Sequence, residues 1–243
     1  MDAMDQTCKL YESSTMRDAT GPTIRPGGFT LTDSAFVACE FRAGAKILDV
    51  GCGSGATVSH LNRTHNAKAV GVDPSDFLLQ LGRAQHPELE LARGVGEALP
   101  FAAAVMDGVF AECTLSLMQD LKQTLREIHR VLRSDGWFVA NDVYARNPAG
   151  AAALQCLSVS SCLRGAIGKD DILQLLQQSG FVLVSWEDHT DLLKQLMVQT
   201  IMQHGSMTEF WLKSSACTMD PVLAQTAMKQ AKMGYYQLIA RKN

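Results

Sequence analysis

Residues 46–55 have the sequence KILDVGCGSG, and this stretch decides the fold. A short apolar run ends in three closely spaced glycines, and residues 56–63, which follow, suit a helix. A glycine loop between a buried strand and a helix lets backbone N–H groups approach a ligand closely, because no side chain blocks them. The stretch therefore predicts the first β-loop-α unit of a ligand-binding sheet.

Strand-like and helix-like segments alternate after this loop, which indicates βαβ units and a mostly parallel sheet. The strand after the loop ends at Asp73, and residues 120–133 have apolar side chains at three- and four-residue intervals, which predicts an amphipathic helix. The strands are expected at residues 46–50, 69–72, 89–92, 108–111, 137–143, 181–186 and 235–240.

The remaining segments predict additions to this sheet. Residues 148–168 are rich in small side chains and residues 188–233 are helical and rich in methionine, so we expect both to form a helical cover. Residues 1–30 are expected to form a lid over the ligand, and residues 31–243 a single α/β domain that carries the cover as insertions.

Composition narrows the class of protein. The chain has 243 residues, 47% of them hydrophobic, which is enough for a core of its own and excludes a disordered chain. A net charge of −3 gives no electrostatic footprint for nucleic acid or an anionic membrane, and no apolar run approaches the roughly 18 residues of a spanning helix. Seven cysteines without a C-x-x-C spacing predict reduced thiols and no metal site. These features favour a cytoplasmic protein.

Two acids distinguish between the nucleoside ligands that a glycine loop can take. Asp73 follows Gly51 by 22 positions, close to the spacing of about 20 at which a carboxylate accepts hydrogen bonds from ribose. Asp49 precedes the loop, where it would repel a pyrophosphate about 4 Å away by roughly 4 kcal/mol at an effective dielectric near 20. A cationic nucleoside is favoured instead, and S-adenosylmethionine has a sulfonium and an ammonium group in place of phosphates. A nicotinamide-dependent oxidoreductase is the less favoured alternative.

Four segments together resemble the class I S-adenosylmethionine-dependent methyltransferases, in the branch that is similar to menaquinone and arsenite methyltransferases (methyltransferase type 11). Residues 47–55 are similar to the first motif of the family, and residues 71–75 (GVDPS) to the second, whose acid binds ribose. Residues 94–101 (GVGEALPF) resemble the loop that contacts adenine, and residues 126–133 (REIHRVLR) are also typical. The resemblance implies an α/β fold with a Rossmann-like, doubly wound sheet of seven strands, the last antiparallel.

The resemblance and the expected strand ends together place a set of residues at S-adenosylmethionine. Val95 stands where relatives often have an Asp that accepts from the adenine amino group, so this contact must come from backbone or from Glu97, or be absent. The residues expected to bind the cofactor are Asp49, Gly51, Cys52, Gly53, Ser54, Gly55, Asp73, Pro74, Val95, Gly96, Glu97 and Glu112.

Methyl transfer is an in-line displacement at an already activated carbon, so the protein mainly positions the reactants. If the acceptor arrives protonated, His189 or His204 is a candidate base, although surface or capping roles are more common for such histidines. Cys113 is a candidate contact to a soft acceptor, and a buried inert thiol is the alternative. The predicted function is methylation of a small, uncharged molecule. A catalytically silent S-adenosylmethionine-binding module is the alternative from another class, and the oligomeric state is open, with a homodimer as one option.

Overall fold

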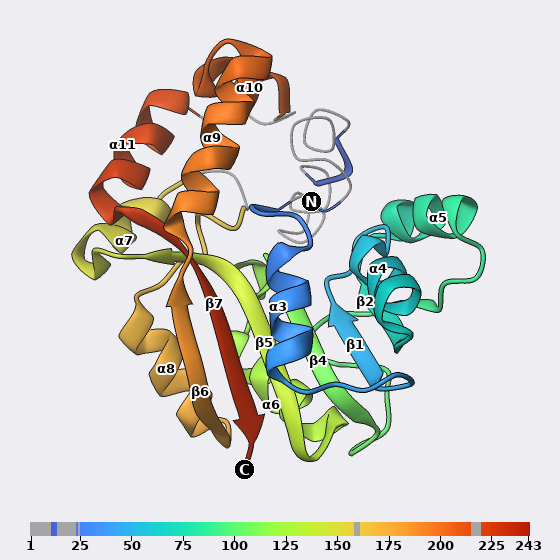
Figure 1. Cartoon of the computed structure of the whole chain (residues 1–243). Helices are drawn as coiled ribbons and strands as arrows, with labels where there is room; N and C mark the ends of the chain where they lie inside the picture. The colour runs from blue at the N-terminus through green and yellow to red at the C-terminus, as the bar shows by residue number, and fades with distance from the viewer. Residues whose placement is uncertain (1–10, 14–22, 24, 158–160, 215–219) are drawn as a thin grey trace.

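A seven-stranded mixed sheet forms the centre of the molecule, for which we use a computed structural model that describes residues 11–13, 23, 25–157, 161–214 and 220–243 (Figure 1). The strand order is β3-β2-β1-β4-β5-β7-β6. The first five strands run parallel, and β7 lies antiparallel between β5 and β6. The strands are β1 (Lys46–Val50), β2 (Lys68–Asp73), β3 (Leu91–Arg93), β4 (Met106–Glu112), β5 (Leu132–Ala145), β6 (Phe181–Asp188) and β7 (Met233–Lys242). The expected class, with seven strands and the last one antiparallel, is confirmed.

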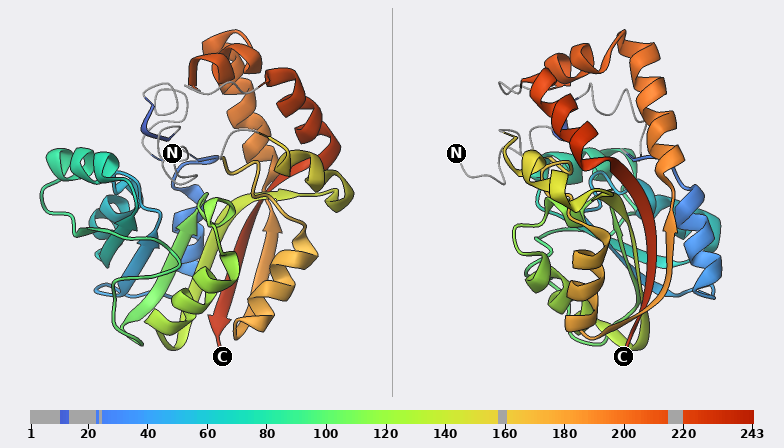
Figure 2. Two further views of the ribbon diagram at one scale, coloured as in Figure 1. Left: turned by 180° about the vertical axis from the view of Figure 1, so that it is seen from behind. Right: turned by 90° about the vertical axis from the view of Figure 1, so that its left-hand side faces the viewer.

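Helices cover both faces of the sheet, as the views from behind and from the side show (Figure 2). One face packs against α3 (Thr30–Ala38), α4 (Ala56–His65) and α5 (Asp76–Gln85), with Phe36, Leu61 and Leu79 in its core. The other face packs against α6 (Leu121–Val131) and α8 (Lys169–Gln178), whose Ile128 and Leu176 lie in the second core. Because both faces are buried, the central strands are almost continuously apolar, which is why residues 46–50 and 108–111 stand out in the sequence.

Residues 134–136, which separate the expected helix from the expected strand at 137–143, are part of β5. Leu132 pairs with Met106 of β4, and the register then shifts before Gly108 pairs with Trp137. Between these two pairings β5 advances five positions and β4 two, and Asp135 has a φ of +61°, so β5 is irregular here. The polar residues 134–136 lie in this irregular part, and β5 begins five residues before the expected strand.

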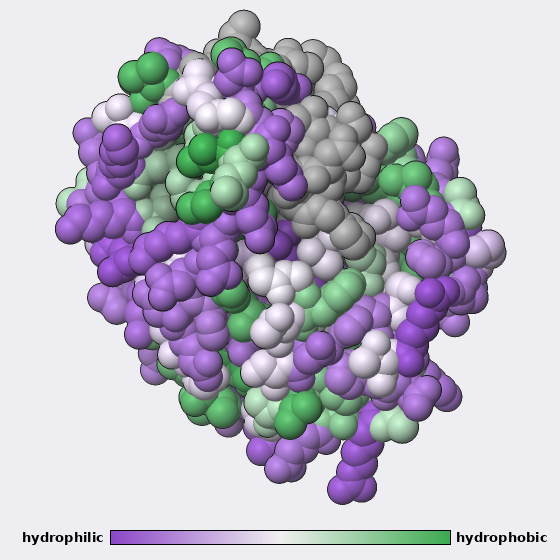
Figure 3. Space-filling model, turned by 45° about the horizontal axis from the view of Figure 1, so that its top comes forward, coloured by the Kyte–Doolittle hydropathy of each residue, from purple (hydrophilic) through white to green (hydrophobic). Residues whose placement is uncertain are grey.

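A separate group of helices lies beyond the end of β5 and the beginning of β7, which are adjacent in the sheet (Figure 1). It contains α7 (Pro148–Gln155), α9 (Thr190–His204), α10 (Met207–Ser214) and α11 (Pro221–Ala231), and it packs through Leu154, Trp211 and Ala227 onto Val143 and Tyr235. These helices lie within the two segments assigned to a cover, and we call them the cover helices. On the face shown in Figure 3, hydrophobic side chains over the cover form small patches between hydrophilic ones.

The lid expected at residues 1–30 falls largely outside the described residues, as do residues 158–160 and 215–219 of the expected cover. Of the lid, the structure describes residues 11–13, 23 and 25–30. The division into lid, domain and insertions thus stays a prediction. Within the described ranges, every helix is too short or too polar to cross a bilayer.

Candidate functional site

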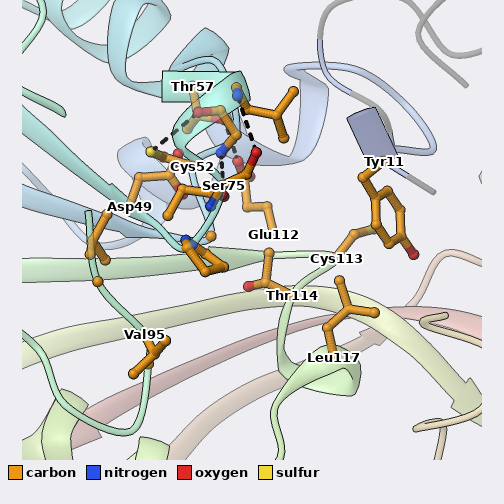
Figure 4. Close-up of a pocket in the computed structure, with 18 of the residues that line it drawn as sticks. Tyr11, Asp49, Cys52, Thr57, Ser75, Val95, Glu112, Cys113, Thr114 and Leu117 are labelled. Carbon is orange, nitrogen blue, oxygen red and sulfur yellow. Dashed lines mark hydrogen bonds between the residues drawn. The ribbon is translucent and has the colours of Figure 1, made fainter. Parts of the chain in front are cut away.

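A pocket of about 180 Å³ opens where β1, β2 and β4 end, at the carboxyl edge of the parallel strands (Figure 4). This edge is where open α/β sheets bind their ligands. Of the residues expected at the cofactor, Gly55 alone does not line the pocket, because it begins α4 behind the loop. The expected residues in the lining are Asp49, Gly51, Cys52, Gly53, Ser54, Asp73, Pro74, Val95, Gly96, Glu97, Glu112 and Cys113.

The glycine loop is held by its backbone. Gly51 and Gly53 have φ values of +75° and +55°, which side chains disfavour. The N–H groups of Gly51 and Cys52 donate to the carbonyl of Val72, at 2.8 and 3.0 Å, so the loop is anchored to β2. A Cβ on Gly51 would overlap the side chain of Thr114, whose hydroxyl donates to the Val50 carbonyl at 2.9 Å. The glycines thus allow the close approach of β4 to the loop.

Asp73 joins this loop to the next helix. Its Oδ2 accepts from the Gly53 N–H and its Oδ1 from the Ser75 N–H, both at 2.8 Å. The Ser75 hydroxyl in turn caps α5 by accepting from the Leu78 N–H. Burial raises the pKa of Asp73, although its two backbone hydrogen bonds act in the opposite direction. A carboxylate that both lines the pocket and is fixed in place is suited to accept ribose hydroxyls.

Asp49 is the least compensated charge in the pocket. Its side chain is buried, and its pKa is raised well above the usual range, first by burial and then by the nearby carboxylate of Glu112. Among the described residues, no ion pair involves Asp49 or Asp73. A cation bound in the pocket would favour the charged form of Asp49, because it would offset the effects of burial and of the Glu112 charge.

Glu112 is neutralised by contacts that sequence reasoning missed. The guanidinium of Arg25 lies 2.9 Å from its Oε2, and the hydroxyls of Thr32 and Thr57 donate to its two oxygens at 2.7 and 2.8 Å. The Asn141 amide donates to Oε1 at 3.0 Å. Arg25 and Glu112 are far apart in sequence, so no spacing links them. The only signal in the sequence that could have indicated the pair is the Glu at the end of a buried strand, because a buried Glu needs a cationic partner.

The expected adenine loop is stabilised by Glu97. Its Oε1 accepts from the backbone N–H groups of Gln119 and Asp120, at 2.8 and 3.2 Å. Glu97 thereby connects the loop after β3 to the start of α6. Gly96 lies directly under Met118, where a Cβ would come within 2.7 Å of the sulfur. Val95 lines the pocket beside these residues and offers no side-chain acceptor.

The opposite end of the pocket contains Tyr11, Cys113 and Leu117, away from Asp49 and Val95 (Figure 4). Cys113 has a φ of +58°, and its thiol donates to the Tyr235 hydroxyl at 3.5 Å. Burial raises the pKa of Cys113 well above the usual thiol value, so this sulfur is protonated and weakly nucleophilic at neutral pH. This is the environment of an inert thiol that packs and donates a hydrogen bond.

The two candidate histidines lie among the cover helices, and neither lines the pocket. His189 precedes α9; its Nε2 lies 3.3 Å from the Glu187 carboxylate, and its backbone N–H donates to Tyr235. His204 ends α9, with its ring 5.4 Å from that of Phe210. The structure thus brings Cys113 to the pocket but places both histidines elsewhere, and a role as base stays a prediction for each.

Comparison with known proteins identifies the family. Residues 48–140 match the model of a family described as a methyltransferase domain. An O-methyltransferase of Aspergillus nomiae, rstn1, is 30% identical over 159 residues, which cover 61% of this chain and 69% of the relative. The chain belongs to the class I S-adenosylmethionine-dependent methyltransferases. A demethylmenaquinone methyltransferase of Chlorobaculum parvum, 34% identical over 104 residues, supports the menaquinone-like branch of this family.

The likeness to other methyltransferases is partial in length. The match spans 43% of the Chlorobaculum parvum enzyme and 60% of O-methyltransferase cnsE of Penicillium expansum. Among solved structures, the [4+2]-cyclase SpnF has a TM-score of 0.72 at 19% identity, with 97% of each chain covered. Phosphoethanolamine N-methyltransferase 2 of Haemonchus contortus, solved with S-adenosylmethionine, has a TM-score of 0.69 at 15% identity, covering 96% of this chain and 56% of that one. At these identities the structures establish the fold of this methyltransferase.

Proposed function

We propose that this protein binds S-adenosylmethionine in the pocket at the ends of β1, β2 and β4 and transfers its methyl group to a small, uncharged acceptor. The observation that carries the proposal is the pair of buried carboxyl groups, Asp49 and Asp73, neither of which forms an ion pair among the described residues. A cationic nucleoside fits this pocket, whereas a pyrophosphate would add like charge to it.

The residues present fit the cofactor at four places. Asp73 would accept the ribose hydroxyls, and Asp49 would face the ammonium group. The backbone of Gly51 and Gly53 leaves room for close approach of the ligand, because neither position carries a side chain. Val95 and Gly96 would contact adenine by packing and by backbone. S-adenosylmethionine supplies a methyl group bonded to a positively charged sulfur.

The chain's own contribution is to position the acceptor and exclude water. Tyr11, Cys113 and Leu117 form a mainly uncharged end of the pocket, which suits a neutral organic acceptor. The thiol of Cys113 and the hydroxyl of Tyr11 remain protonated, because burial raises the pKa of both. The relatives support a small-molecule acceptor, since they include O-methyltransferases and demethylmenaquinone methyltransferases.

Turnover of the cofactor in the presence of acceptors tests the proposal. We would incubate the purified protein with S-adenosylmethionine and a small-molecule extract, then quantify S-adenosylhomocysteine and metabolites that gain a methyl mass. Formation of both products is expected. At limiting cofactor it should be reduced in Asp73→Ala but kept in Asp76→Asn, an exposed neighbour that pairs with Arg93. Tight binding without turnover in any extract would favour a silent binding module. Preferential binding of a dinucleotide in a competition titration would overturn the cofactor assignment.

We further propose that the protein acts in the cytoplasm and does not bind nucleic acid. The five free cysteines among the described residues, together with a net charge of −3, support this proposal. A homodimer remains the option to test by sedimentation at several protein concentrations.

A further inference from the structure

Three potential metal ligands meet between two helices that lie side by side on one face of the sheet (Figure 1). Asp33 comes from α3, and His60 and His65 come from α4. The Nε2 atoms of both histidines point at the same carboxylate oxygen, Oδ1 of Asp33, at 2.6 and 2.7 Å. One ligand atom of each residue lies within 4.8 Å of the others, and within the described parts of the chain no second group of this kind occurs.

The two imidazole rings are held in place by stacking. Phe29 stacks on His60 with ring centroids 4.0 Å apart and the planes inclined by 3°. Phe36 stacks on His65 at 4.1 Å and 21°. Each histidine side chain is 16% exposed, whereas that of Asp33 is 43% exposed. Two nitrogen donors are thus fixed in orientation, and the carboxylate is free to adjust at the solvent side.

The outer contact of His60 suits metal binding through Nε2. Without a metal, Nε2 donates to the Asp33 carboxylate, so a bound ion would take the place of this proton. The Nδ1 of His60 lies 3.4 Å from the Thr64 hydroxyl, which is able to accept a hydrogen bond once the proton is on Nδ1. Such a contact would orient the ring toward the metal. His60 therefore has both the direction and the outer contact that metal-binding histidines use.

We propose that Asp33, His60 and His65 bind a divalent transition metal, with zinc as the representative ion. Two imidazoles and one carboxylate suit zinc and its neighbours in the first transition row, whereas calcium and magnesium prefer an all-oxygen set. At metal–ligand distances of about 2.0–2.2 Å, tetrahedral ligand atoms stand roughly 3.3 Å apart. Asp33 must therefore move outward by roughly half an ångström, and its exposure permits this shift. A fourth position remains for water.

The site would act as a clamp outside the reaction centre, since none of its three residues lines the pocket. Asp33 follows Thr32, which donates to Glu112, and α4 carries Thr57, which contacts both Arg25 and Glu112. An ion that links α3 to α4 would thus hold together the two helices that contact the buried Arg25–Glu112 pair. We expect the bound ion to raise the stability of the fold and to reduce the motion of the residues that form this side of the pocket.

Direct metal binding tests this inference separately from methyl transfer. Untagged protein, stripped with a chelator, would be titrated with Zn²⁺ by calorimetry and with Co²⁺ by visible absorption. We expect one equivalent to bind, with the intense bands of tetrahedral Co²⁺ and a rise in melting temperature. His60→Gln and His65→Gln should each lower the affinity at least 100-fold. His86→Gln is the matched control, because His86 is a partly exposed histidine beside Arg63 and Glu88.

Three results would overturn the site. They are the absence of stoichiometric binding at micromolar metal, equal binding by the wild type and both site variants, and loss of binding in Cys156→Ser, which removes an exposed thiol. Circular dichroism would show whether His60→Gln and His65→Gln keep the fold. If one of them does not, Asp33→Asn provides a milder variant, because its side chain is partly exposed and the substitution preserves its shape.

Discussion

The guanidinium of Arg25 and the carboxylate of Glu112 form a buried ion pair, with Nη1 2.9 Å from Oε2 and side chains only 4% and 2% exposed. Thr32 and Thr57 bridge the same two groups, so every charged oxygen of Glu112 has a partner. The pair attaches the segment before α3 to the end of β4, directly at the wall of the pocket.

Breaking this pair should destabilise the fold strongly. Glu112→Gln leaves Arg25 buried without a counter-charge, and we expect the free energy of unfolding to fall by about 3–5 kcal/mol. Urea denaturation measures the change. Glu88→Gln is the control, because Glu88 pairs with Arg63 at the surface, where water screens the charges, and its loss should have little effect on stability. Equal losses in the two variants would mean that burial of the first pair is energetically irrelevant.

Removing the carboxylate of Asp73 should weaken binding of S-adenosylmethionine. Asp73→Ala deletes a charge-assisted hydrogen bond worth about 1.5–3 kcal/mol, so the dissociation constant should rise roughly ten- to a hundred-fold. Calorimetry checks this, with Asp76→Asn as the control, since Asp76 is exposed and does not line the pocket. Unchanged affinity in Asp73→Ala would eliminate the ribose role of this residue.

A methyl group added to the glycine loop should disrupt both stability and binding. Gly51→Ala must adopt a φ of +75° and displace the side chain of Thr114, so we expect a loss of about 2–5 kcal/mol. Gly44→Ala is matched in backbone strain, with a φ of +82°, but its Cβ would meet no atom within 4 Å. It should lose about 1–2 kcal/mol and retain cofactor affinity. If both variants bind S-adenosylmethionine equally well, the close contact between Gly51 and Thr114 is not needed for cofactor binding.

The buried carboxyl of Asp142 should make stability depend on pH. Burial raises its pKa from 3.8 to about 6, even though Ser116 donates to both of its oxygens. Between these values the folded state binds more protons than the unfolded state, so the contribution to stability is full below pH 4 and is lost as the pH rises through 6. The loss amounts to about 3 kcal/mol.

Asp142→Asn isolates this effect, because an amide does not titrate. The stability of the variant relative to the wild type should improve by about 2–3 kcal/mol between pH 4.5 and pH 7.5, as measured by urea denaturation. Asp135→Asn, at an exposed position of β5, should show a nearly constant difference. A constant difference for Asp142→Asn as well would show that this carboxyl titrates normally.

Much of the pocket follows from local sequence because its chemistry is local. The glycines of residues 51–55 and the acid Asp73 belong to short strand-loop-helix units, in which spacing along the chain sets position in space. Asp49 and Glu112 end neighbouring parallel strands, so the order of the sheet brings both to one edge. All the predicted cofactor residues except Gly55 therefore line the pocket, together with residues such as Arg25 and Thr57 that the sequence did not indicate.

The remaining features depend on the packing of helices that are distant in the sequence. Arg25 reaches Glu112, and Asp33 meets His60 and His65, only because α3 packs beside α4 against the sheet. Likewise, His189 lies away from the pocket because the cover helices extend beyond the end of β5 and the beginning of β7. The alternation of strands and helices and the spacing of the glycines were enough to predict the fold and the edge of the sheet at which the pocket lies. These signals depend only on residues that are close together in the sequence. Only the tertiary structure decided which charges are neutralised and which groups converge, because such contacts depend on how whole elements pack.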